Sequence, residues 1–269
     1  MSKLDDNLID FFNKKRIRVL HNILWARGIE QINSILRDIY NNDLQNNITT
    51  LILIFIVDDY AGHITSYTNQ IIIRTSIYRS KILKNELVLP YIWEYSSVPF
   101  EPLPKTNMPI VGFCGLASRY RRTLIQKIKN NKKIQDNFIE RQDFWGGNPH
   151  GKQIVDEFND NIQNSHFVIC NRGAGNFSMR LYQTLAFGRI PLLLNTDMIL
   201  PFEKYINYNE LFIIGNTEDE IIEKLLDCWE NKDIVLMQKQ CADIFREFFG
   251  PDKFPIYLYN EILDKQNNG

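Results

Sequence analysis

The segment from Phe167 to Phe202 constrains the fold most, because it holds four parts in a fixed order. A short apolar run at 167–170 is typical of a strand, and a turn that contains two glycines follows at 171–176. The stretch 177–187 then predicts a helix, with a glycine at its end where a C-cap glycine belongs. A second apolar strand follows at 190–194. The order strand, loop, helix, strand predicts a βαβ unit and therefore a parallel sheet.

The loop in the middle of this unit has the properties of an anion site. It lies at the carboxyl end of a parallel strand, where open α/β sheets bind ligands. The following helix is expected to point free backbone N–H groups and its positive dipole end toward the loop. Arg172 adds a planar guanidinium that can hold two phosphate oxygens, and Arg180 follows within the helix. We expect a diphosphate site here, although a tight turn with surface arginines would show the same pattern.

Short motifs with fixed gaps run through the segment: Arg172-Gly173, Ser178-Met179-Arg180-Leu181-Tyr182, Leu185, Gly188-Arg189-Ile190-Pro191 and Leu200-Pro201-Phe202. Their order and gaps resemble the signature of the exostosin family, glycosyltransferase family 47. That family reads approximately Pro-Arg-Gly, a variable loop, Ser-x-Arg, an apolar and an aromatic residue, Glu-Ala-Leu, Gly-Cys-Ile-Pro-Val and Leu-Pro-Phe. Outside the segment the resemblance is weaker and is confined to the expected strands before Pro90 and at 109–115.

The resemblance implies which residues contact the nucleotide of a sugar donor. Gln183 stands where the family usually has a Glu that hydrogen-bonds the ribose, and Gln keeps an acceptor oxygen but loses the charge. Arg121 and Arg122 lie where a helix is expected to begin, after the expected strand that ends at Phe113, and they are expected to add positive charge, although a solvated helix start would also carry them. The candidate donor-site residues are Arg172, Gly173, Asn176, Ser178, Arg180, Gln183, Arg121 and Arg122.

Composition and charge limit the classes of partner. With 269 residues the chain is long enough for two small α/β domains. The formal net charge of −1 gives no general basic field, so nucleic acid is not expected as a partner. The four cysteines form no Cys-x-x-Cys pair, which argues against a zinc site. Abundant isoleucine, asparagine and lysine are typical of an AT-rich genome, such as that of a large DNA virus.

The beginning of the chain and its apolar runs bear on localisation. Four of residues 1–6 are polar or charged, and the stretch lacks the pattern of a signal peptide. The longest apolar run, Leu51 to Val57, is too short to span a bilayer. We therefore expect a soluble, cytoplasmic protein without a membrane span, unlike cellular exostosins, which are usually membrane-anchored.

Prolines at 90, 99, 102, 104 and 109 indicate a joint between two domains. We expect an acceptor-side α/β domain at 1–100, with the linker at about 90–109. A nucleotide-sugar domain is expected at 105–250, followed by a helix within 251–269 that crosses back to the first domain. The expected fold class is α/β and GT-B-like, with two facing Rossmann-like domains, parallel sheets and a cleft between them.

A general base is expected at the carboxyl end of the apolar run that begins at Leu51. Asp58 and Asp59 follow this run, and neighbouring side chains on an extended chain point opposite ways. We favour Asp59, with Asp58 close behind and His63 as a group that orients or replaces it. An Asp pair that caps a turn would look the same, and Glu94 and Asp143 are further candidates. Asp58-Asp59 is not an Asp-x-Asp metal motif, so we expect no metal or other cofactor.

These features favour an inverting glycosyltransferase that moves a sugar from a nucleoside diphosphate sugar, above all a UDP-sugar, to a glycan. The acceptor would be a hydroxyl of an oligosaccharide or of a glycoprotein glycan. A fucosyltransferase-like enzyme that uses a GDP-sugar would share the phosphate site. A catalytically inactive glycan-binding module is the alternative from another class, and the Gln183 departure keeps it open.

Overall fold

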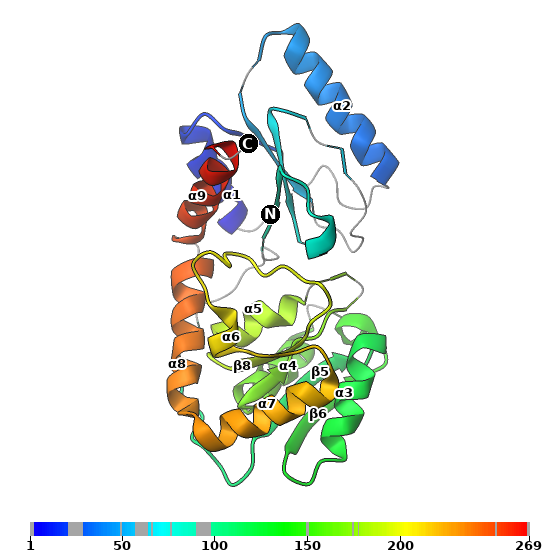
Figure 1. Ribbon diagram of the computed structural model, residues 1–269, viewed down its shortest axis with the longest axis vertical. Helices are drawn as coiled ribbons and strands as arrows, with labels where there is room; N and C mark the ends of the chain where they lie inside the picture. The colour runs from blue at the N-terminus through cyan, green and yellow to red at the C-terminus, as the bar shows by residue number, and fades with distance from the viewer. Residues whose placement is uncertain are drawn as a thin grey trace.

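The computed structural model describes residues 3–20, 29–48, 50–56, 64–65, 67–75, 77–89, 98–148, 151–173, 175–176, 178–250 and 252–267. Figure 1 shows two units along the long axis, each built around its own sheet. Every strand pair within these sheets is parallel. The expected GT-B-like α/β class with two parallel sheets is therefore confirmed, while the cleft between the units stays a prediction.

The amino-terminal unit holds a four-stranded sheet in the order β1-β2-β3-β4. Its elements are α1 (Lys3–Lys14), β1 (Arg18–Leu20), α2 (Ile29–Gln45), β2 (Ile52–Ile56), β3 (Gln70–Arg74), the short helix η1 (Arg79–Lys81) and β4 (Glu86–Val88). As expected for an apolar run, β2 is an inner strand, paired with β1 and β3. Helix α1 was not expected, because its charged residues mask the apolar face that carries Leu8 and Phe12, both buried.

The carboxy-terminal unit holds a five-stranded sheet in the order β6-β5-β7-β8-β9. Its strands are β5 (Ile110–Leu116), β6 (Gln135–Arg141), β7 (Phe167–Ile169), β8 (Ile190–Leu194) and β9 (Ile213–Gly215). Its helices are α3 (Arg119–Lys129), η2 (Phe144–Gly147), α4 (Lys152–Gln163), α5 (Met179–Ala186), α6 (Tyr208–Leu211), α7 (Glu218–Asn231), α8 (Ile234–Ile244) and the π-helical turn η3 (Phe245–Phe249).

The βαβ unit expected from the sequence is present as β7, α5 and β8. The two strands are parallel neighbours, with Phe167 opposite Ile190. Helix α5 ends as expected before Gly188, whose φ of 63° is a left-handed conformation that favours glycine. The helix begins at Met179, later than expected, and Phe177 lies outside the described residues. The loop between β7 and α5 is therefore longer than the sequence suggested.

The last helix, α9 (Phe254–Asn267), lies beside α1 of the amino-terminal unit, as Figure 1 shows. The ring of Tyr259 lies 6.0 Å from that of Phe11 and 6.4 Å from that of Phe12. Lys204 pairs with Asp264 and so ties the helix to the carboxy-terminal unit as well. The end of the chain thus contacts both units.

The segment before β5 is held on the carboxy-terminal unit by His166. Its Nδ1 accepts a hydrogen bond from the Ile110 N–H at 3.1 Å, and its Nε2 lies 2.9 Å from the Pro104 carbonyl oxygen. The imidazole is buried against the ring of Trp229 at 4.8 Å. This arrangement uses a neutral ring, because Nδ1 can accept a hydrogen bond only without a proton.

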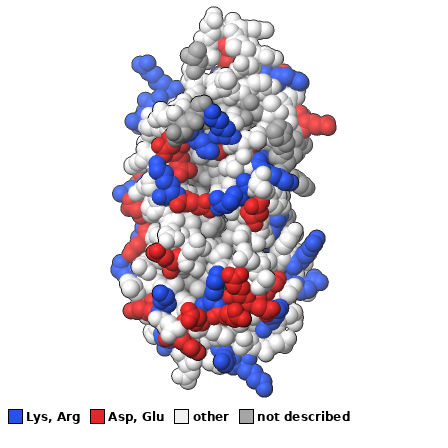
Figure 2. All heavy atoms as spheres, viewed as in Figure 1, with Lys and Arg blue, Asp and Glu red and all other residues white. Residues whose placement is uncertain are grey.

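Among the described residues, no helix has the length and apolar character needed to cross a membrane. Basic and acidic side chains are interspersed over the face drawn in Figure 2, in keeping with the net charge of −1. The positive charge that matters for the site described next is therefore local.

Candidate anion site at the carboxyl end of the second sheet

Arg180 lies where strands β5 and β7 separate. The two strands pair only at Val111 and Gly112 of β5, which face Phe167 and Val168 of β7. Beyond that point the Arg180 guanidinium lies between them, with Nη2 donating to the Cys114 carbonyl at 2.6 Å and Nη1 to the Ile169 carbonyl at 3.3 Å. Helix α5 therefore fixes the ends of both strands through one side chain.

The surroundings of Arg180 are apolar as well as polar. The side chain is 8% exposed, and its guanidinium lies 4.6 Å from the centre of the Phe113 ring. Burial lowers the pKa of Arg180 from its usual value. Within the described part of the chain its buried Nε has no hydrogen-bond partner. A cation held in this way raises the positive potential at the end of the sheet.

Arg121, in the first turn of α3, lies next to Arg180. Its Nε donates to the Asn171 carbonyl at 3.2 Å and its Nη1 to the Leu116 carbonyl at 3.1 Å. Burial and then the neighbouring charge of Arg180 lower the pKa of Arg121 to about 9. In the described ranges neither arginine forms a salt bridge with a carboxylate. Two adjacent cations that donate to backbone carbonyls keep their positive charge, and they are a favourable environment for an anion.

Arg172, in the loop after β7, is the more exposed of the three arginines. Its Nη1 donates to the Tyr78 hydroxyl at 2.8 Å. The guanidinium also lies 4.5 Å from the ring centre of Tyr120 and 5.5 Å from that of Tyr78. Because it is only half-buried, Arg172 is placed to contact a ligand that the buried pair cannot reach.

Two asparagines hold the loop in place. Asn171 is fully buried, donates to the Tyr120 carbonyl at 2.9 Å and accepts from the Leu194 N–H at 2.8 Å. Asn176 donates to the carbonyls of Ile77 at 3.2 Å and of Thr196 at 3.1 Å. Asn176 was a candidate contact of the sugar donor in the sequence, and these bonds show that it fixes the loop.

The start of α5 lacks a capping hydrogen bond from a side chain. Ser178 is its N-cap residue, yet the side chain makes no capping hydrogen bond to the first turn. Helices leave their first N–H groups without a partner inside the helix, and these groups attract anions. The loop also comes close to the arginines, because a Cβ added at Gly173 would lie 3.2 Å from Arg121 Nη2. The structure thus brings Arg121, Arg172, Gly173, Ser178 and Arg180 to one end of the sheet.

The remaining candidates are placed differently. Arg122 is exposed on α3, one residue beyond Arg121. Gln183 is half-buried on α5. Asp58, Asp59, His63 and Glu94 lie outside the described residues, and Asp143 is exposed before η2. The identity of the base therefore stays a prediction. In the described ranges, no three His, Cys, Asp or Glu side chains come together as metal ligands.

The sequence did not point to Tyr78 or Tyr120 as partners of Arg172. Tyr120 lies among the arginines at 119–122, and an aromatic residue between basic residues was the available signal. Tyr78 gave none, because 94 positions separate it from Arg172. Contacts of that range depend on how the two units come together, which local patterns do not encode.

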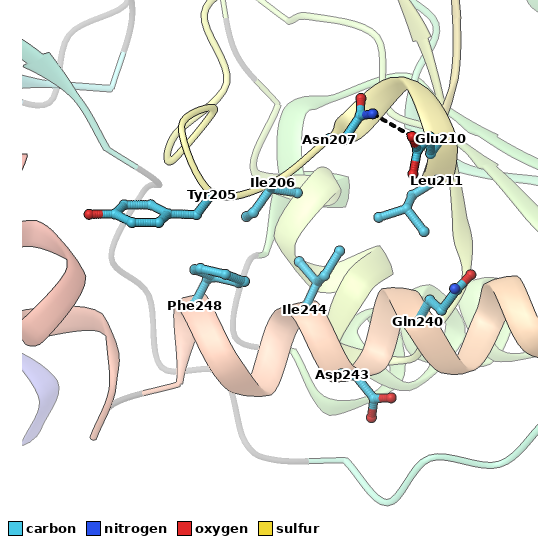
Figure 3. A pocket seen from close by; sticks show the side chains of 9 residues that line it. All are labelled: Tyr205, Ile206, Asn207, Glu210, Leu211, Gln240, Asp243, Ile244 and Phe248. Carbon is cyan, nitrogen blue, oxygen red and sulfur yellow. Dashed lines mark hydrogen bonds between the residues drawn. The ribbon is translucent and has the colours of Figure 1, made fainter.

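A pocket of about 310 Å³ lies elsewhere, between the loop before α6 and helix α8 (Figure 3). Leu211 and Ile244 point toward each other across it, whereas Asp243 points away. Its lining residues are Tyr205, Ile206, Asn207, Glu210, Leu211, Gln240, Asp243, Ile244 and Phe248. None of them belongs to the arginine group, so this pocket is distinct from the candidate anion site.

Comparison with known families bears on this end of the sheet. Residues 110–225 match the Exostosin GT47 domain, a range that begins with β5 and contains Arg121, Arg172 and Arg180. The carboxy-terminal unit is exostosin-like. The resemblance seen in the motifs between Arg172 and Phe202 is thereby confirmed. It does not extend to a viral source, which nothing in the match supports.

Two curated plant proteins share this region. A probable glucuronosyltransferase from Oryza sativa subsp. japonica is 29% identical over 85 residues, which are 31% of this chain and 20% of that protein. A probable glycosyltransferase from Arabidopsis thaliana is 29% identical over 120 residues, which are 44% of this chain and 21% of that protein. The exostosin-like chain thus spans about a fifth of the length of these relatives.

Solved structures are similar only at a general level. TarM has a TM-score of 0.47 at 10% identity, covering 81% of this chain and 50% of that one. A TarM variant from S. aureus in complex with fondaparinux, α-GlcNAc-glycerol and UDP has a TM-score of 0.43 at 11% identity, covering 84% and 53%. A putative UDP-N-acetylglucosamine 2-epimerase from Listeria monocytogenes has a TM-score of 0.37 at 11% identity, covering 90% and 82%.

Proposed function

We propose that this exostosin-like chain is a glycosyltransferase that uses a nucleoside diphosphate sugar, namely a UDP-sugar, and an acceptor hydroxyl on a glycan. The observation that carries the proposal is the convergence of Arg121, Arg172 and Arg180 with the start of α5. They meet at the carboxyl end of a parallel sheet, within the range that matches the Exostosin GT47 domain. A diphosphate is the part of such a donor that these groups fit.

The three arginines differ in exposure, and we therefore propose different roles for them. Arg172 is half-buried and would donate directly to phosphate oxygens, together with N–H groups of the loop and of α5. Arg121 and Arg180 are each 8% exposed and donate to backbone carbonyls, so they would act through their charge. Fixed positive charge in a buried site stabilises the negative charge that develops on a leaving diphosphate.

The chemical step we propose is a single displacement. The acceptor oxygen forms a bond to the anomeric carbon from the side opposite the diphosphate. The bond between that carbon and the β-phosphate oxygen breaks, and the diphosphate leaves with the electron pair. The acceptor proton passes to a general base, for which Asp59 is favoured over Asp58 and His63. Such a displacement inverts the anomeric configuration, and the arginines would take the role that a metal has elsewhere.

Gln183 is proposed as the ribose contact. It lies on α5, one turn beyond Met179, and its side chain is half-buried. An amide oxygen can accept a hydrogen bond from a ribose hydroxyl, as a carboxylate would, but without the added strength of a charge. Gln183→Glu is therefore expected to tighten nucleotide binding, and Gln183→Ala to weaken it.

A thermal-shift titration with UDP, GDP, CMP and a panel of UDP-sugars tests the proposal. A ligand that binds only the folded chain raises the unfolding temperature with concentration. We expect UDP or a UDP-sugar to raise it for the unaltered chain and for Arg122→Ala, and much less at the same concentration for Arg172→Ala. Arg122 was also a candidate donor-site residue in the sequence, and it serves as the matched control because its side chain is exposed on α3.

The other outcomes of the titration separate the alternatives. A shift with GDP alone would favour the fucosyltransferase-like enzyme that uses a GDP-sugar. No shift with any nucleotide would contradict the donor site and favour a glycan-binding module without turnover. A shift that Arg172→Ala leaves unchanged would place the nucleotide elsewhere, for example in the pocket beside α8.

A further inference from the structure

Segment 77–81 of the amino-terminal unit lies against the loops of the carboxy-terminal unit. The Ser80 N–H donates to Asp197 Oδ2 at 3.1 Å, and the Arg79 N–H donates to the Asp197 carbonyl at 2.8 Å. Arg79 also pairs with Glu203 at 2.6 Å. Tyr78 forms an antiparallel bridge with Met198. The segment therefore docks on the loop that follows β8, through both backbone and side-chain contacts.

The receiving loop contains unusual backbone. Asp197 has a φ of 59° and Phe202 a φ of 61°, which are left-handed conformations that non-glycine residues seldom adopt. Such conformations persist where the surroundings determine them, and they concentrate near functional sites. Here Asp197 is bound by segment 77–81, and Phe202 is 1% exposed, with its ring against those of Phe249 and Phe254.

The same docked segment brings Tyr78 onto Arg172. The Tyr78 hydroxyl accepts a hydrogen bond from Arg172 Nη1 at 2.8 Å, and its ring lies 5.5 Å from the guanidinium. The ring centre of Tyr120, from α3, lies 4.5 Å from the same guanidinium. Asn176 links the same loop to the Ile77 carbonyl at 3.2 Å. The half-buried arginine is thus held by one aromatic ring from each unit.

We propose that Tyr78 is a positioning residue for the diphosphate, acting through Arg172 from the opposite unit. The inference rests on the proposed function, since it names a group that orients the arginine of that site. An arginine side chain loses rotamer freedom when it binds an anion, and holding it in one orientation beforehand reduces that loss. Because Tyr78 belongs to the amino-terminal unit, that unit would contribute to nucleotide affinity through the hydroxyl of this one residue.

Tyr78→Phe is the sharpest variant, because it keeps the ring and removes only the hydroxyl. We expect UDP to bind about threefold to tenfold more weakly, which lies within the range for the net contribution of one typical hydrogen bond. In an Arg172→Ala background the same change should have no further effect, since its partner is gone. A purely structural role would lower affinity equally in both backgrounds.

Ser80→Ala is the matched control. Ser80 belongs to the same segment as Tyr78, and the substitution removes its hydroxyl, which contacts Asp197. It leaves Tyr78 and Arg172 intact. We expect unchanged UDP affinity for this variant. Calorimetric titration of UDP, with thermal unfolding of each variant as the check of folding, supplies both readings.

The outcomes distinguish this inference from the function on which it rests. If the unaltered chain binds UDP, Arg172→Ala weakens binding strongly and Tyr78→Phe changes nothing, the role of Tyr78 is overturned and the function stands. Equal weakening by Tyr78→Phe and Ser80→Ala would also overturn it, because docking alone would then matter. If the unaltered chain binds neither UDP nor pyrophosphate, both the function and the inference fall.

Discussion

Arg180 and Cys114 are joined by a hydrogen bond of 2.6 Å between the guanidinium and the backbone carbonyl. The bond runs from helix α5 to strand β5, across the point where β5 and β7 part. A second bond from Arg180 reaches the Ile169 carbonyl in β7. Beyond the last pair of residues joined between β5 and β7, the Arg180 side chain links the two strands by its own hydrogen bonds. Its positive charge therefore lies at the end of the sheet where the candidate site is.

Replacing Arg180 should cost stability as well as binding. Arg180→Leu leaves the carbonyls of Cys114 and Ile169 without this donor, and each buried unsatisfied group costs about 1–3 kcal/mol. We expect the free energy of unfolding to fall by roughly 2–4 kcal/mol, measured by urea denaturation. Arg122→Ala, which removes an exposed arginine, should stay within about 0.5 kcal/mol of the unaltered chain. Equal effects from the two variants would contradict the bridging role.

Gly115 is required by the position of Arg180. Its φ is +146°, and an added Cβ would lie 2.7 Å from Arg180 Nη2. Gly115→Ala should therefore lower both stability and UDP affinity, since strain of about 1–3 kcal/mol is added and the arginine is displaced. Gly147→Ala is the control, because Gly147 also has a positive φ but an added Cβ would meet nothing within 4 Å. That variant should cost only about 1–2 kcal/mol of stability and leave UDP affinity unchanged.

The fold class followed from local patterns. Apolar runs such as the one from Leu51 set the inner strands, and glycine at 188 marked the end of α5. Helix α1 was missed, because its charged residues are as prominent in the sequence as the buried Leu8 and Phe12. Burial of one helix face depends on a partner, here α9 from the other end of the chain, and local composition does not reveal that partner.

The candidate site was predicted in part. Arg172 and Arg180 were named from their motif, and both lie at the end of the second sheet. From the sequence, both arginines were expected to contact the diphosphate directly. In the structure Arg180 is buried, whereas Arg172 is half-buried. That difference arises from the separation of β5 and β7, which is a tertiary feature. The contact between Tyr78 and Arg172 joins two units and could not be inferred from spacing.

His166 should make stability depend on pH. Burial lowers the pKa of His166, so between this value and the unfolded value near 6.5 the unfolded chain binds a proton that the folded chain does not. The contribution of the neutral His166 ring to the free energy of unfolding is therefore fully present above about pH 6.5. It declines as the pH falls through that value, by at most about 1.4 kcal/mol per pH unit.

Denaturation at several pH values between 8 and 5 tests this dependence. His166→Gln removes the titrating ring, so the decline that His166 causes should disappear from the variant, although the variant is less stable at pH 8. The measured quantity is the difference between the two chains at each pH. An equal slope for both chains would show that other groups cause the dependence.

Two substitutions test which residue is the general base. Asp58→Asn and Asp59→Asn each remove one carboxylate and keep the size of the side chain. One of them, with Asp59 favoured, should lower turnover of the donor by about 10²–10⁴-fold while UDP binding persists. Release of UDP from UDP-sugars in the presence of glycan acceptors measures turnover. Full activity in both variants would move the role to His63, Glu94 or Asp143.

The most direct test of the account compares UDP with uridine on two chains. Calorimetric titration of the unaltered chain and of Arg172→Ala gives four affinities, from which the contribution of the diphosphate follows by difference. We predict that UDP binds the unaltered chain far more tightly than uridine does, and that most of this advantage is lost in Arg172→Ala. An advantage of UDP over uridine that survives the substitution would contradict the claim that the loop after β7 holds the diphosphate.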